Sequence, residues 1–457
     1  MSREDTRRYL ILKDPNIYKG LIFLALPVML NNFIKTIHDI VDMYFVSKIA
    51  DHSADAVSSI SITFPVLFMF ISIGIGLGIA GTALISQFVG SNLREDAKRY
   101  ATNLFIISVF VGLLLNIIAF FGAPFIMELM GASGFLLENS VSYLQIRSFE
   151  LTAVFIFFAF TSIKQADGDT LTPMYYGVVT IILNIILSPI LISVLNLGVQ
   201  GAAYATLIAN VVILPFVLYQ LFFSKNGLTI SIINRGYNLK VVTEIVNTAV
   251  PASTGQALTA VGFIIMNAII ISYGTETLAA FSVGNRLSSL ILHPVMAIGT
   301  VLAAYIGQNI GNLNVSRAKE SVRKGMILSV SVMVVLSFIA LFLREPMISL
   351  FLEDDPVSFN LAVRYMFFLI IGLPLMAIFQ TFVGTYNGAG RTNYTFIVGV
   401  TRLFILRIPL IFVFKYLTDM GSSGIWTAML ISNFIIAFIG YAFYTKLDFT
   451  PKIDIQG

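Results

Sequence analysis

The sequence predicts an all-α integral membrane protein whose twelve transmembrane helices form two pseudo-symmetric six-helix lobes. Three observations predict this fold class: the composition, a series of long apolar segments and an internal repeat. Of the 457 residues, 57% are hydrophobic and 11% are charged, whereas soluble domains carry about 25% charged residues. The net charge of +4 comes from basic residues spread through short loops, which argues against a nucleic-acid partner.

Each apolar segment is long enough to cross a lipid bilayer, which requires about 20 residues in a helix. The predicted spans are 18–47, 58–88, 100–123, 138–164, 174–195, 200–224, 241–273, 279–308, 325–343, 359–386, 394–417 and 424–445. Nearly all loop lysines and arginines fall on the side of the chain termini, and the opposite loops hold only Lys48 and Arg344. This asymmetry predicts cytoplasmic termini.

The second half of the chain repeats the motifs of the first half at an offset of 220 to 224 residues. Gln87-x-x-Gly90 recurs as Gln308-x-x-Gly311, and Gly198-x-x-Gly201 recurs as Gly421-x-x-Gly424. We therefore expect an N-lobe at 1–224, a linker at 225–240 and a C-lobe at 241–457. Because each lobe has an even number of spans, the two would share one topology about an axis along the membrane normal.

Ionisable residues interrupt the first span between Leu30 and Lys48. Such groups cost about 2.5–3.5 kcal/mol in hydrocarbon and usually face a bundle interior or a wet cavity. Lys35, Asp39 and Asp42 are spaced i, i+4, i+7 on one helical face, which we interpret as facing a transport cavity, with Asp42 binding a coupling cation. Asp39 could instead pair with Lys35. In the C-lobe the position equivalent to Asp42 is Met266, so cation binding is predicted in the N-lobe.

Other polar residues in the spans have a structural and a functional interpretation. Glu150 follows Arg147 by three residues, so it could form an ion pair within the helix or face a cationic substrate. Asn184 and Ser188 share a face, and with Thr206 they could hydrogen-bond between helices or supply oxygen ligands to Na⁺. Arg402 could pack between helices or contact substrate. No nucleotide-binding, catalytic or cofactor motif is present, so neither an enzyme nor a cofactor is expected.

At this point the sequence resembles the multidrug and toxic compound extrusion (MATE) family. The residues that carry the resemblance are Leu24–Pro27, Val41–Val46, Gln87–Gly90, Gly168–Pro173, Gly198–Ala203 and Arg407–Leu410. The resemblance implies a secondary active antiporter that exports organic cations in exchange for Na⁺ or H⁺ by alternating access between two lobes. A monomer in the lipid bilayer of a prokaryotic cell (inner) membrane is expected. The alternative is a flippase for lipid-linked precursors from the same superfamily.

Several residues coincide with functional positions of the family. Asp42 matches the aspartate that binds the coupling ion, and Asn184 and Thr206 match other polar positions of one prokaryotic branch; with Asp42 they would be the ligands of Na⁺ if sodium is the coupling ion. Ser188 is a departure, because that branch usually has a second aspartate there, and we hypothesise that Asp39 or Glu150 replaces it. A substrate cavity is predicted near Glu150, Gln256, Met266 and Arg402.

Overall fold

The structure is a computed structural model that describes residues 3–47, 53–224, 227–232, 237–352 and 355–454, with the backbone alone at 39–47 and 53–57. The described residues form helices and contain no strand. Among the described residues, eleven helical segments are long and apolar enough to cross a membrane, or twelve if the bent pair α5 and α6 forms one span. These helices match the twelve predicted spans, so the predicted fold class is confirmed.

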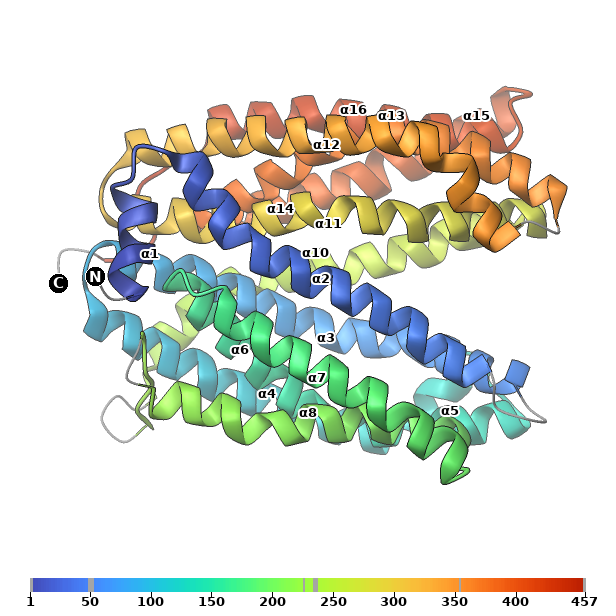
Figure 1. Cartoon of the computed structure of the whole chain (residues 1–457), viewed down its shortest axis with the longest axis horizontal. Coiled ribbons are helices and arrows are strands. Elements are labelled where there is room, and N and C mark those ends of the chain that lie inside the picture. The colour runs from blue at the N-terminus through green and yellow to red at the C-terminus, as the bar shows by residue number, and fades with distance from the viewer. Residues whose placement is uncertain (1–2, 48–52, 225–226, 233–236, 353–354, 455–457) are drawn as a thin grey trace.

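The first half of the chain forms α1 (Arg3–Leu12), α2 (Ile17–Ser47), α3 (Ser53–Gly90), α4 (Arg94–Leu129), α5 (Gly134–Ser148), α6 (Leu151–Ala166), α7 (Leu171–Pro189), η1 (Ile190–Val194) and α8 (Gly198–Phe222). The second half forms α10 (Leu239–Ile271), α11 (Thr275–Gly311), α12 (Val315–Leu352), α13 (Pro356–Gly388), α14 (Thr392–Val400), η2 (Thr401–Arg407), α15 (Ile408–Leu417) and α16 (Ser422–Thr445). We call α2 to α8 the N-lobe helices and α10 to α16 the C-lobe helices. Both chain ends lie at the same end of the bundle, which we call the terminal end (Figure 1).

The first helix of each lobe is packed partly into the other lobe. Ile17, Leu21 and Leu24 of α2 are buried in one apolar cluster with Val301 and Tyr305 of α11. Reciprocally, the start of α10 is buried in the cluster formed by α3, α4 and α6. This exchange ties the lobes together at the terminal end. Helices α3 and α10 cross, and beyond the crossing their axes diverge toward the opposite end (Figure 1).

The two lobes approach each other closely where the repeated motifs meet. A Cβ atom on Gly90 at the end of α3 would lie 1.9 Å from the backbone oxygen of Gln308 in α11. The symmetric contact is also present, because a Cβ atom on Gly311 would lie 1.9 Å from the backbone oxygen of Gln87. Only a residue without a side chain permits this approach, so the repeated glycines close the terminal end.

The short helix α1, which the sequence did not predict, lies across this closed end. Tyr305 Oη donates a 2.6 Å hydrogen bond to the Leu10 carbonyl oxygen, and Arg317 Nε donates one of 2.9 Å to the carbonyl of Ile11. On the N-lobe side, the Arg7 guanidinium lies 2.8 Å from the Asp169 carboxylate. Helix α1 therefore joins both lobes.

Asp167, between α6 and α7, is a buried acid at the terminal end. Burial raises the pKa of its carboxyl from 3.8 to about 6, against the opposing charge of Arg94 at 3.8 Å. Because this pKa is higher in the folded chain than in the unfolded chain, the stabilisation from Asp167 is fully present below pH 3.8. It is lost as the pH rises through about 6.

We expect Asp167→Asn to remove this pH dependence. Thermal unfolding of the purified protein between pH 5 and 8 should show wild type losing stability as the pH rises, by about 1.4 kcal/mol, and the variant losing less. Burial also raises the pKa of the neighbouring Asp169, but Arg7 and Thr172 outweigh it and hold that pKa below its usual value. Asp169 therefore does not titrate in this window, and identical slopes for both proteins would contradict the prediction.

Candidate functional site

Three membrane-spanning segments contain irregular backbone, and polar residues lie at each of them. Helices α5 and α6 meet at a 44° bend next to Glu150. The π-helix η1 follows Ser188, and the π-helix η2 spans Thr401–Arg407, with an arginine near each end. Non-helical backbone at membrane depth is tolerated where it is buried in protein or lines a cavity, and π-helical turns are frequent at functional sites.

In the N-lobe, Glu150 is buried at the α5–α6 bend, with 1% of its surface exposed. Its Oε1 lies 2.6 Å from Arg147 Nη2, which confirms the predicted ion pair. Its second oxygen, Oε2, accepts a 3.4 Å hydrogen bond from Asn210 Nδ2 of α8. The carboxylate is thus held from both sides, by its own span and by a neighbouring helix.

A cluster of side-chain oxygens continues from Asn210 along α7 and α8. Asn210 Nδ2 donates to the Thr206 carbonyl at 3.0 Å, and Asn184 Nδ2 donates to Thr206 Oγ1 at 3.0 Å. Ser188 Oγ donates to Asn184 Oδ1 at 2.9 Å. The predicted residues Asn184, Ser188, Thr206 and Glu150 therefore belong to one connected network, which we call the N-lobe network. The hydrogen bond from Asn184 of α7 to Thr206 of α8 is a contact between helices, as the structural interpretation of these residues predicted.

The two acids of the first span, Asp39 and Asp42, have side chains outside the described residues. Their backbone belongs to α2. That helix packs closely on α7, because a Cβ atom on Gly177 would lie 2.5 Å from Asn31 Oδ1. The helix that carries Asp39 and Asp42 is thus a direct neighbour of the helix that carries Asn184 and Ser188.

The C-lobe contains a cavity of about 120 Å³, which we call the C-lobe cavity. Its polar lining consists of Asn285, Ser288, Tyr365, Arg402, Arg407, Trp426 and Asn433. Arg407 donates to Asn433 Oδ1 at 2.7 Å and to Ser432 Oγ at 3.2 Å. Arg402 Nη1 lies 3.0 Å from the Met376 sulfur, and its guanidinium is 4.4 Å from the centre of the Phe379 ring.

The repeat relates this cavity to the N-lobe network with opposite charge. At an offset of 223 residues, Asn210 corresponds to Asn433 and Asn184 corresponds to Arg407. In the N-lobe the asparagine amide donates to a buried acid, whereas in the C-lobe the asparagine oxygen accepts from a buried arginine. The two equivalent asparagines therefore contact a carboxylate in one lobe and a guanidinium in the other.

The remaining predicted cavity residues lie elsewhere in the C-lobe. Met266 is buried in an apolar cluster with Leu403 and Trp426, and Gln256 is half-buried on α10. Neither residue lines the C-lobe cavity, whereas Arg402 does. Sequence reasoning assigned no site role to Trp426 or Asn433, although the repeat offset pairs Asn433 with Asn210 and could have drawn attention to it.

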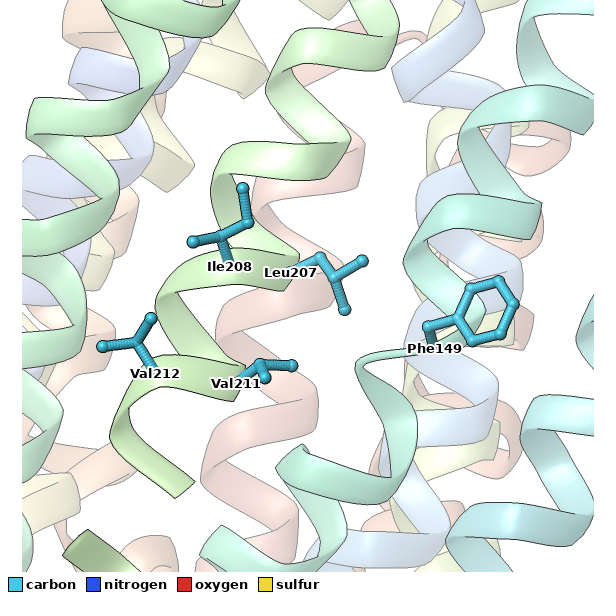
Figure 2. Close-up of a pocket in the computed structure, with 5 residues that line it drawn as sticks. All are labelled: Phe149, Leu207, Ile208, Val211 and Val212. Carbon is cyan, nitrogen blue, oxygen red and sulfur yellow. The ribbon is translucent and has the colours of Figure 1, made fainter. Parts of the chain in front are cut away.

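A larger groove of about 460 Å³ lies between α8 and the α5–α6 bend. Figure 2 shows Leu207 and Val211 of α8 pointing toward the segment that carries Phe149. Its lining is apolar, with Ile208 and Val212 completing it, so it offers no group that would select a cation. Among the described residues, no group of three or more His, Cys, Asp or Glu side chains could hold a metal ion.

Comparison with known proteins shows the family. The MatE family model matches residues 27–190 and again 251–413. The probable multidrug resistance protein YoeA of Bacillus subtilis (strain 168) is 24% identical, with 94% of each chain covered. The multidrug export protein MepA of Staphylococcus aureus (strain MRSA252) is 27% identical over 95% of this chain and 94% of MepA.

The fold is also found among solved structures. A multidrug resistance MATE family transporter of the MOP superfamily, solved in an outward-facing conformation, superposes with a TM-score of 0.90. It is 23% identical, and 96% of each chain is covered. The MatE family model thus matches two segments that together contain most of the chain, and the chain has the fold of this solved transporter. The chain therefore belongs to the MatE family of multidrug efflux transporters.

Proposed function

We propose that this protein is a secondary active antiporter that exports organic cations in exchange for Na⁺ or H⁺. Transport would proceed by alternating access between the lobes, in a bacterial cell membrane with both termini in the cytoplasm. The observation that carries the proposal is the N-lobe network, in which a buried carboxylate is connected to three side-chain oxygen groups. An ionisable group inside a membrane protein usually marks an ion or substrate path.

The coupling ion would bind between α2 and α7. Asp42 would supply the charge, and Asn184, Ser188 and Thr206 would supply neutral oxygens of the kind that hard cations prefer. With H⁺ as the coupling ion, the carboxylate of Asp42 alone would carry the proton. Asp39 is the second acid of this helix face, and Glu150 at the other end of the network would attract the cationic substrate.

The closed terminal end supports the direction of the cycle. With the cytoplasmic side sealed at Gly90 and Gly311, substrate would leave and the coupling ion would enter from the opposite side. An ion drives the lobes to rock only if its affinity differs between the two states. Binding at Asp42 would do this by bending α2, which contains Pro27, a residue that weakens the helical hydrogen-bond ladder.

Everted membrane vesicles test this proposal. An imposed Na⁺ or H⁺ gradient should drive uptake of a fluorescent organic cation such as tetramethylrhodamine methyl ester, and the effective gradient identifies the ion. We expect Asp42→Asn to abolish gradient-driven uptake, while Asp39→Asn reduces it less. Normal uptake by Asp42→Asn would remove the proposed coupling site, and uptake that needs no gradient would exclude antiport.

A further inference from the structure

The C-lobe cavity holds two arginine side chains, and the described part of the chain places no acid beside them. Arg407 is 6% exposed, and within the part of the chain that the structure describes neither Arg402 nor Arg407 has a carboxylate within 4.0 Å. Removing a charged group from water costs several kcal/mol unless a partner of opposite charge is present. The groups that contact the Arg402 guanidinium are the thioether sulfur of Met376 and the ring of Phe379. Both are neutral, so they do not balance its positive charge.

Two hydrogen-bond donors at this cavity have no acceptor. Arg402 Nε and Trp426 Nε1 are both buried and make no hydrogen bond, and both residues line the cavity. Trp426 is held in a stack, with its ring centre 6.0 Å from that of Phe281 and 4.1 Å from that of Tyr365. Buried donors are nearly always satisfied in folded proteins, so the rigid indole N–H and the guanidinium N–H can both donate to an oxygen atom of a ligand that enters the cavity.

The π-helix η2 explains why both arginines reach one cavity. Arg402 and Arg407 are five residues apart, a spacing that an α-helix would place on different faces. A π-helical turn closes at i to i+5, so η2 brings both side chains to the same side. Such a turn interrupts the regular α-helical hydrogen bonding in the middle of a span. Because π-helical turns are frequent at functional sites, we infer that this one serves function and not packing alone.

We propose that the C-lobe cavity is a subsite for the carboxylate of a transported substrate, with Arg402 and Trp426 as the donors that hold it. The inference rests on the proposed export function for its biological meaning, but the binding site stands on its own contacts. A planar carboxylate matches the fork of a guanidinium, which can donate two parallel hydrogen bonds. A cavity of about 120 Å³ has room for a carboxylate and the atoms next to it.

The chain offers an intrinsic probe for this site, because Trp426 is its single tryptophan. We expect benzoate to change the tryptophan fluorescence of the purified protein saturably at constant ionic strength, and the neutral analogue benzamide to leave it unchanged. Arg402→Gln should weaken benzoate binding about tenfold or more, since a charge-assisted hydrogen-bond pair is lost. The matched control is Arg344→Gln, which removes another C-lobe arginine stacked on a ring, 5.7 Å from the centre of Phe367. It should bind benzoate as wild type does.

Equal responses to benzoate and benzamide, or equal benzoate affinity in wild type and Arg402→Gln, would overturn the proposal. Bromide that quenches Trp426 saturably and is not displaced by benzoate would make the cavity a halide site, and would also overturn it. A transport arm compares tetramethylrhodamine, which carries a free carboxylate, with its methyl ester. Arg402→Gln should lower uptake of the acid more than uptake of the ester. Failure of wild type to transport the ester would count against the export function, while the benzoate titration would still judge the cavity.

Discussion

Replacing Gly90 with alanine should abolish transport, because the new methyl group cannot fit while the terminal end is closed. Its Cβ would lie 1.9 Å from the Gln308 oxygen and 2.6 Å from the Gln308 carbonyl carbon, whereas ordinary contact begins at 3.4 Å. These are backbone atoms of α11, so no side-chain rotation relieves the overlap and the helices must separate. Interiors are packed too densely to absorb such a shift locally. The closed state is therefore expected to lose population to states that are open at the terminal end.

Cysteine labelling can follow this opening, since the natural chain contains no cysteine. Ser86 is fully buried beside Gly307 at the interface between the lobes, so Ser86→Cys places a thiol inside the closed end. A membrane-permeant maleimide should react slowly in the Ser86→Cys background and much faster when Gly90→Ala is added. Uptake of the cationic dye by everted vesicles should be lost in parallel.

The matched control is Gly399→Ala, another glycine-to-alanine change within a membrane helix. A Cβ atom on Gly399 meets nothing within 4 Å, so labelling and transport should stay as in wild type. Gly311→Ala should reproduce the effect of Gly90→Ala, because it overlaps the Gln87 oxygen at 1.9 Å. Slow labelling and normal transport in both interface variants would show that the glycines do not hold the lobes together.

The second large effect is expected from Arg147→Met, which leaves the buried carboxylate of Glu150 without its counter-ion. Glu150 is 1% exposed, and its other side-chain donor is Asn210 at 3.4 Å. Removing one partner of a buried ion pair typically destabilises a protein by about 3–5 kcal/mol. Methionine keeps most of the apolar volume of the arginine side chain, so the loss would come from the charge and its hydrogen bonds.

Denaturation titrations in mixed micelles can measure this loss of unfolding free energy. The informative comparison is the double variant Arg147→Met with Glu150→Gln, which carries no buried charge at the α5–α6 bend. We expect it to be more stable than Arg147→Met alone, whereas Glu150→Gln alone should cost less because 17% of the Arg147 side chain is exposed. If the two changes were simply additive, Arg147 and Glu150 would not be coupled and the bend would be held by apolar packing.

Local properties of the chain predicted much of the fold and part of the site. Span length and composition predicted the membrane helices because a bilayer-crossing helix needs a long apolar run. Helical spacing predicted the Arg147–Glu150 pair and placed Asn184 beside Ser188, since residues three and four apart share a face. The repeated Gln-x-x-Gly motif was recognised as well, although its contact across the lobes was not.

The sequence by itself determined that this is a membrane protein of two repeated halves. The spans of the first half contain acidic residues, and the equivalent positions of the second half do not. Only the tertiary structure decided that α2 and α10 exchange their first turns between lobes, because the partners of an apolar face are set by packing between distant segments. It also decided that Arg402 and Arg407 share a cavity with Trp426. A spacing of five residues separates side chains on an α-helix, and the π-helical turn that brings them together depends on the helices packed around it.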